Sequence, residues 1–106
     1  MEAKVIFADE KLKEVFDLLR ESDNELYKKI SKALAHIKNN IWAGRQVKKK
    51  LIPKFLVDKY KIANLWIFNL GKDWRLLYSL GKDEIEILAI VLDWMDHKDY
   101  ERLFNF

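Results

Sequence analysis

The chain lacks cysteine, and its 106 residues include a single proline and three glycines. Without cysteine, neither a disulfide framework nor a thiolate metal site can form, which fits a reducing compartment. No apolar run approaches the ~18–20 residues that cross a bilayer. Acidic Asp9 follows the first apolar segment too soon for a secretory signal peptide. We therefore expect a cytoplasmic protein with no membrane contact.

The sequence also lacks a glycine-rich phosphate-binding loop and any spacing of histidines and carboxylates typical of a metal site. We therefore expect neither a metal nor a cofactor. Half of the residues are nevertheless hydrophobic, which is enough for a proper core. The length suits one unit, so we predict a single domain over residues 1–106.

Positive charge is concentrated in one segment. The formal net charge is only +3, but residues 41–61 carry seven basic side chains against the single acid Asp58. Such a segment can attract a polyanion even when the whole molecule is nearly neutral. The alternative is a solvated lysine face that binds nothing.

The first half predicts a strand followed by two helices. Residues 3–8 are typical of a short strand, and Asp9 is a suitable N-cap for an amphipathic helix that extends to about Ser22. Ser22 and Glu25 match a capping box that would start the second helix. The apolar stripe of that helix consists of Leu26, Ile30, Ala33, Leu34, Ile37 and Ile41. From Asn39 the periodicity stops, and we expect a long irregular connection.

The second half predicts an antiparallel meander of three strands, at residues 65–70, 74–80 and 85–92. Gly71 and Gly81 lie where tight hairpins need a residue that tolerates positive φ. The third strand is almost continuously apolar and should lie inside the sheet. The fold class is therefore α+β, a two-layer β-α-α-β-β-β arrangement in which the sheet packs on the helical hairpin. A tail over residues 93–106 should form a short helix.

Strand alternation places an arginine on the open side of this sheet. Leu76 and Tyr78 share the face that we expect to pack against the helices. Arg75 and Leu77 therefore lie on the other face. A concave surface could form there, beside the tail that carries His97 and Tyr100.

These side chains have the chemistry to cleave RNA without a metal. Arg75 can hold a phosphate through two hydrogen bonds. His97 can act as an acid or base, and Tyr100 can donate a proton or stack on a base. Candidate RNA-binding residues in the basic segment are Arg45, Lys48, Lys49, Lys50 and Lys54.

Each candidate also has a structural explanation. Arg75 could form an ion pair with Glu84 or Glu86. His97 could be incidental, and Tyr100 could belong to the core at helical spacing from Phe104.

The order of elements and three segments resemble the RelE/ParE superfamily of type II toxin–antitoxin toxins, on the RelE side, over essentially the whole chain. The segments are Asn64-Leu65-Trp66, Trp74-Arg75-Leu76-Leu77-Tyr78 and the stretch from Asp96 to Phe104. The second is similar to the family's aromatic-Arg-x-x-Tyr strand. The third is similar to the His-Lys-x-Tyr ending of one subgroup.

The resemblance implies an mRNA interferase that inhibits translation. Such a toxin cleaves mRNA by 2′-hydroxyl attack on the adjacent phosphate, in many members on the ribosome, and a cognate antitoxin holds it inactive. By position, Arg75, His97 and Tyr100 are similar to the family's catalytic residues. Three alternatives stay open: a ParE-like gyrase poison, a degenerate toxin that only binds an antitoxin, and a plain nucleic-acid-binding module.

Overall fold

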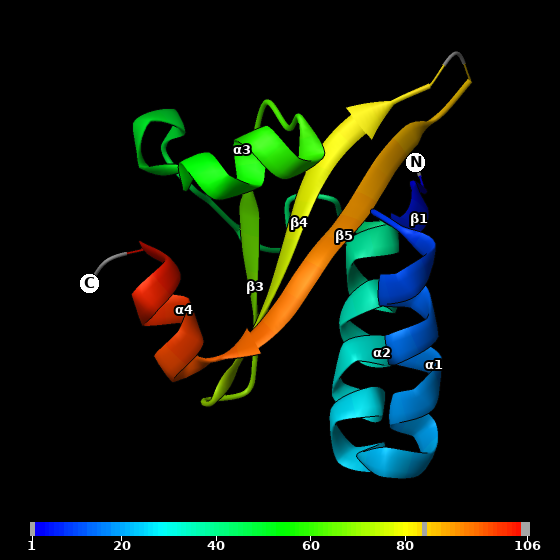
Figure 1. Cartoon of the computed structure of the whole chain (residues 1–106). Coiled ribbons are helices and arrows are strands. Elements are labelled where there is room, and N and C mark those ends of the chain that lie inside the picture. The colour runs from blue at the N-terminus through cyan, green and yellow to red at the C-terminus, as the bar shows by residue number, and fades with distance from the viewer. Residues whose placement is uncertain (1, 84, 105–106) are drawn as a thin grey trace.

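A computed structural model describes residues 2–83 and 85–104. A five-stranded sheet carries helices on both faces (Figure 1). The elements, in chain order, are β1 (Lys4–Phe7), α1 (Glu10–Ser22), α2 (Asn24–Asn39), β2 (Arg45–Gln46), the 3₁₀ turn η1 (Lys49–Leu51), α3 (Lys54–Tyr60), β3 (Trp66–Leu70), β4 (Trp74–Lys82), β5 (Ile87–Asp96) and α4 (His97–Phe104). Within the described part of the chain, no helix is both long and apolar enough to cross a membrane.

The sheet has the strand order β1-β5-β4-β3-β2. β3, β4 and β5 form the predicted antiparallel meander, β2 adds an antiparallel edge, and β1 pairs in parallel with β5. The prediction that the third meander strand lies inside the sheet is confirmed, because β5 has a neighbour on each side. The α+β class and the packing of the sheet on a helical hairpin are confirmed as well.

The main core lies between the sheet and the α1–α2 hairpin. Ile30 and Ile37 of α2 pack there against Leu76 and Tyr78 of β4, and all four side chains are at most 1% exposed. Truncating such a side chain to alanine typically costs ~2–5 kcal/mol. Strand alternation therefore assigned the two faces of β4 correctly.

The opposite face is less open than the alternation indicated. α3 and α4 lie on that side of the sheet, away from the hairpin (Figure 1). Their side chains form a second core in which Leu56 and Tyr100 pack with Leu77 and Leu92. An open groove remains beside Arg75, between α4 and the segment that contains β2 and η1.

The helix boundaries correct two details of the prediction. The N-cap of α2 is Asp23, whose carboxylate accepts a hydrogen bond from the amide of Leu26, rather than Ser22. Ser22 ends α1 and donates its hydroxyl to the carbonyl of Leu18. Ile41 lies beyond α2, which ends at Asn39. Asp9 caps α1 as expected, accepting from the amide of Leu12.

The prediction of a long irregular connection after α2 is only partly right, because the connection contains regular elements. It contains the edge strand β2, the turn η1 and the helix α3, with Pro53 as the N-cap of α3. Leu56 gives α3 its stability because it is buried in the second core. A seven-residue helix with one buried side chain is too short for periodicity to reveal.

The hairpin predictions are half right. Gly71 has φ 73° in the turn between β3 and β4. Gly81 instead lies inside β4, which continues to Lys82. β5 begins at Ile87 and runs on to Asp96, so the tail starts four residues later than predicted. Residue 84, named above as an ion-pair candidate, lies outside the described residues.

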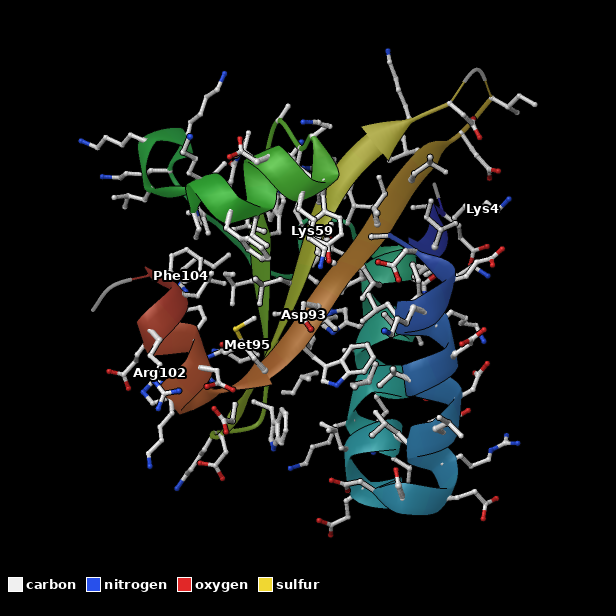
Figure 2. The ribbon with its side chains drawn as sticks, viewed as in Figure 1. Lys4, Lys59, Asp93, Met95, Arg102 and Phe104 are labelled. Atoms are coloured by element: carbon white, nitrogen blue, oxygen red, sulfur yellow. The ribbon has the colours of Figure 1, made fainter. Side chains whose placement is uncertain are left out.

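A β-bulge explains how β5 accommodates its polar end. Leu77 pairs with Asp93 but Tyr78 pairs with Val91, so Leu92 is an extra residue in β5. Asp93 consequently lies on the same side as Met95, toward α3 and α4 (Figure 2). Burial there raises the pKa of the Asp93 carboxyl, and the hydrogen bond from the Trp94 amide and the charge of Lys59 partly oppose that rise.

A buried tyrosine fixes the loop that leads into β2. The Tyr78 hydroxyl donates to the carbonyl of Ile41 at 2.8 Å and accepts from the amide of Gly44 at 3.0 Å. Burial raises the pKa of Tyr78, so the phenol stays protonated and can donate. A Cβ on Gly44 would lie 2.7 Å from the carbonyl oxygen of Ile67 and 2.9 Å from the Tyr78 hydroxyl. These contacts hold the loop in one close-packed position. Arg45 is the next residue along the chain, so its backbone position is fixed as well.

We expect Gly44→Ala to destabilise the protein strongly, because the new methyl group must displace β3 or the Tyr78 hydroxyl. Gly81→Ala is the matched control, since its Cβ would meet only the end of the Ile90 side chain, at 3.4 Å. In urea denaturation followed by circular dichroism, Gly44→Ala should lose ~2 kcal/mol or more and Gly81→Ala less than ~1 kcal/mol. Equal losses would contradict this description of the loop.

Candidate functional site

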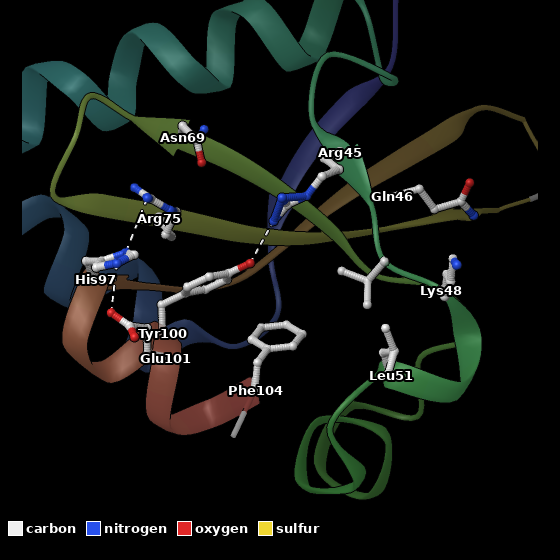
Figure 3. A pocket seen from close by; sticks show the side chains of 11 residues that line it. Arg45, Gln46, Lys48, Leu51, Asn69, Arg75, His97, Tyr100, Glu101 and Phe104 are labelled. Carbon is white, nitrogen blue, oxygen red and sulfur yellow. Dashed lines mark hydrogen bonds and ion pairs between the residues drawn. The ribbon is translucent and has the colours of Figure 1, made fainter. Parts of the chain in front are cut away.

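A groove of about 490 Å³ opens on the sheet face that α4 partly covers (Figure 3). β2 and η1 form one wall, β3 and β4 form the floor, and α4 forms the other wall. The lining residues are Arg45, Gln46, Val47, Lys48, Leu51, Asn69, Arg75, His97, Tyr100, Glu101 and Phe104.

Two backbone features bring Arg75 and His97 together. Arg75 is the second residue of β4 and lies between Asn69 of β3 and Met95 of β5. The amide of His97 donates to the carbonyl of Asp73 at 2.7 Å, which attaches the start of α4 to the β3–β4 turn. Residues 22 positions apart in sequence thereby become neighbours, with Arg75 Nη2 3.3 Å from His97 Nδ1.

Arg75 has no carboxylate partner among the described residues. Its guanidinium donates to the carbonyls of Lys72 and Trp74 and to the ring of His97. The predicted alternative of an ion pair with Glu86 is therefore wrong. A guanidinium with only neutral acceptors keeps its charge available for an anion in the groove.

His97 links Arg75 to Glu101. Because a guanidinium can only donate, Nδ1 of His97 must act as the acceptor, which places the ring proton on Nε2. Nε2 lies 2.7 Å from Glu101 Oε1 and donates to it. The three side chains thus form a hydrogen-bonded chain along one wall of the groove, drawn with dashed lines in Figure 3.

Tyr100 belongs to the second core and also lines the groove. Its ring belongs to the second core, is 6% exposed and packs against Phe104 at 4.9 Å between centroids. Its hydroxyl accepts from Arg45 Nη2 at 2.6 Å, while the Arg75 guanidinium lies 5.6 Å from the ring centroid. A ring buried to this extent offers little face for stacking on a base, so its hydroxyl is the part that a ligand can reach.

The basic segment divides into two parts. Arg45 and Lys48 line the groove, whereas Lys49, Lys50 and Lys54 do not. Lys54 lies 3.6 Å from Asp58 on the exposed side of α3. Apart from His97, the described part of the chain lines the groove with three cationic side chains and one carboxylate, that of Glu101. Its field therefore favours an anionic ligand.

Three polar side chains of the groove were not identified from the sequence: Gln46, Asn69 and Glu101. Glu101 could have been predicted, because a residue at i+4 from His97 lies on the same side of a helix. Asn69 carried no such local signal, since its place opposite Arg75 depends on the β3–β4 register.

Within residues 2–83 and 85–104, no three histidine or carboxylate side chains gather closely enough to hold a metal ion.

Comparison with known proteins gives a match in structure only. No protein-family model matches the sequence, and no curated protein matches it significantly. The structure is similar to that of a YoeB/ParE toxin from Agrobacterium tumefaciens, with a TM-score of 0.61 over 89% of this chain and 98% of that chain. The chain has the fold of this toxin. The two sequences are 15% identical, so the likeness is one of architecture.

The ring packing of Tyr100 and the hydrogen bond of its hydroxyl can be separated by mutation. We expect Tyr100→Phe to keep the packed ring and lose the Arg45 hydrogen bond, at a cost of ~1 kcal/mol in the free energy of unfolding. Tyr100→Ala should cost ~3–5 kcal/mol, because it also leaves a cavity in the second core. Chemical denaturation measures both values, and a phenylalanine variant as unstable as the alanine variant would show that the hydroxyl is structural.

Proposed function

We propose that the protein is the toxin of a toxin–antitoxin system and an endoribonuclease that cleaves mRNA by 2′-hydroxyl attack on the adjacent phosphate. The observation that carries this proposal is the hydrogen-bonded chain of Arg75, His97 and Glu101, which shares one groove with the Arg45–Tyr100 pair. The toxin fold of the structural neighbour supports the assignment.

The first requirement of the reaction is fixed positive charge around the phosphate. Arg75 and Arg45 both contact Tyr100, one over its ring and the other at its hydroxyl, so the two guanidiniums converge on the same part of the groove. A phosphate between them would receive charge-assisted hydrogen bonds that strengthen as negative charge develops on its oxygens.

The second requirement is a base for the 2′-hydroxyl. When Arg75 turns its Nη2 donor toward a phosphate oxygen, Nδ1 of His97 loses its present partner and can accept the 2′-hydroxyl proton. Glu101 holds the opposite nitrogen and stabilises the imidazolium that forms, as a carboxylate does when it orients a catalytic histidine.

The third requirement is an acid for the departing 5′-oxygen. We assign this role to Tyr100, whose hydroxyl accepts from Arg45 and lies in the lining of the groove. The departing 5′-oxygen keeps the electron pair of the broken P–O bond and takes the phenolic proton. A 2′,3′-cyclic phosphate then remains on the upstream fragment.

The proposed partners follow from the same charges. A cationic groove would be covered by a cognate antitoxin that carries acidic residues, and it would be filled by mRNA, either free or on the ribosome, in the cytoplasm. The competing functions are a gyrase poison and a degenerate toxin that only binds its antitoxin.

Expression of the wild-type protein without an antitoxin should arrest growth of the host. Arg75→Ala should lower the rate of mRNA cleavage by ~10²–10³-fold and restore growth, because it removes a cation aligned with the developing charge. His97→Ala should lower the rate by ~10²-fold or more, the usual contribution of general acid–base catalysis. Lys54→Ala, outside the groove and paired with Asp58, is the matched control.

Cleavage is measured on mRNA with and without ribosomes, and each variant is checked for folding by circular dichroism. Full toxicity of the Arg75→Ala/His97→Ala double variant would contradict the proposal. Growth arrest without cleavage of either RNA substrate, accompanied by inhibition of gyrase, would establish the competing function.

A further inference from the structure

A second hollow of about 400 Å³ adjoins the groove at the edge of the sheet. It lies around β3, and its lining includes His36 of α2 and Phe68 of β3. Phe68 packs against the hairpin-side core, so this hollow extends to the face opposite the groove. Arg45 and Asn69 line both cavities. Because β2 is an edge strand of two residues, the two hollows meet around it without a further strand between them.

The second hollow has the chemistry of a nucleotide subsite. The His36 and Phe68 rings meet edge to face, 5.5 Å apart, and the Arg45 guanidinium adds a fixed positive charge. No carboxylate lines it among the described residues. Aromatic and guanidinium groups beside a cationic path are typical of surfaces that bind single-stranded RNA.

An exposed tryptophan stands next to this hollow. Trp42 is 67% exposed and precedes Ala43 and Gly44, both of which line the hollow. The loop is held in place: the amide of Trp42 donates to Asn40 Oδ1 at 3.1 Å, and the amide of Gly44 donates to Tyr78. An exposed indole ring beside a cationic hollow can stack on a base of single-stranded RNA.

We propose that single-stranded RNA leaves the groove past Arg45 and Asn69, places its next nucleotide in the second hollow and stacks a base on Trp42. This inference rests on the proposed function and adds that the enzyme reads a strand longer than the two nucleotides at the cleaved bond. Trp42 is a binding residue in this account and takes no part in the chemistry.

The experiment compares two ligands that cannot be cleaved, a 2′-fluoro dinucleotide and a 2′-fluoro hexanucleotide of mixed sequence. Fluorescence anisotropy gives the affinity of the labelled hexanucleotide, and competition gives that of the dinucleotide. We expect Trp42→Ala to raise the Kd for the hexanucleotide at least fivefold, or about 1 kcal/mol, and to leave the dinucleotide unchanged. Trp42→Phe should recover most of the loss and Trp42→Leu should not, because stacking needs an aromatic face.

Leu18→Ala is the matched control, since Leu18 is 66% exposed on α1 and lines neither cavity. Equal hexanucleotide affinity of Trp42→Ala and wild type, with Arg75→Ala still defective, would overturn this inference and leave the proposed function standing. Loss of antitoxin binding alone in Trp42→Ala would overturn it too, by assigning the tryptophan to a protein partner. Failure of the wild type to bind either oligonucleotide would overturn both proposals.

Discussion

The candidate site depends on an irregularity in the pairing of β4 and β5. The extra residue at Leu92 resets the alternation of β5, so that Met95 lies beside Arg75 on the face away from the helical hairpin. The strand then runs on to Asp96, and the amide of His97 reaches the carbonyl of Asp73. Without the bulge, the last residues of β5 would point to the opposite face. The position of His97 beside Arg75 is therefore a consequence of sheet geometry.

The charge of the groove depends on where the fold places the acidic residues of the C-terminal segment relative to Arg45 and Arg75. The C-terminal segment is acidic, yet among its described residues, up to Phe104, only the carboxylate of Glu101 lines the groove. Asp93, Asp96 and Asp99 line a different hollow, which α3, the end of β5 and α4 surround. Arg45 and Arg75 meanwhile converge on Tyr100. The acidic residues therefore do not neutralise the groove, although they are close to it in sequence.

The spacing of apolar residues predicted those parts of the fold that depend on residues close together in the sequence. The period of two in β4 separated Leu76 and Tyr78 from Arg75, and the period of 3.6 gave both helices of the hairpin. The same reasoning failed at Gly81, which lies inside β4 and not in a turn. It also failed at the end of β5, where a bulge and polar residues interrupt the apolar pattern. The site was predictable in part for the same reason. Arg75, His97, Tyr100, Arg45 and Lys48 line one groove, whereas Lys49 and Lys50 of η1 and Lys54 of α3 do not line it.

The central claim is that side chains of this groove direct the 2′-hydroxyl against its own phosphate, and the ends of the RNA products test it most directly. Mass spectrometry of RNA cleaved in excess EDTA should show a 2′,3′-cyclic phosphate or its 3′-phosphate hydrolysis product on the upstream fragment and a 5′-hydroxyl on the downstream fragment. A single 2′-deoxy substitution at the cleaved position should abolish the reaction. Products with a 3′-hydroxyl and a 5′-phosphate, or undiminished cleavage of the deoxy-substituted RNA, would contradict the account.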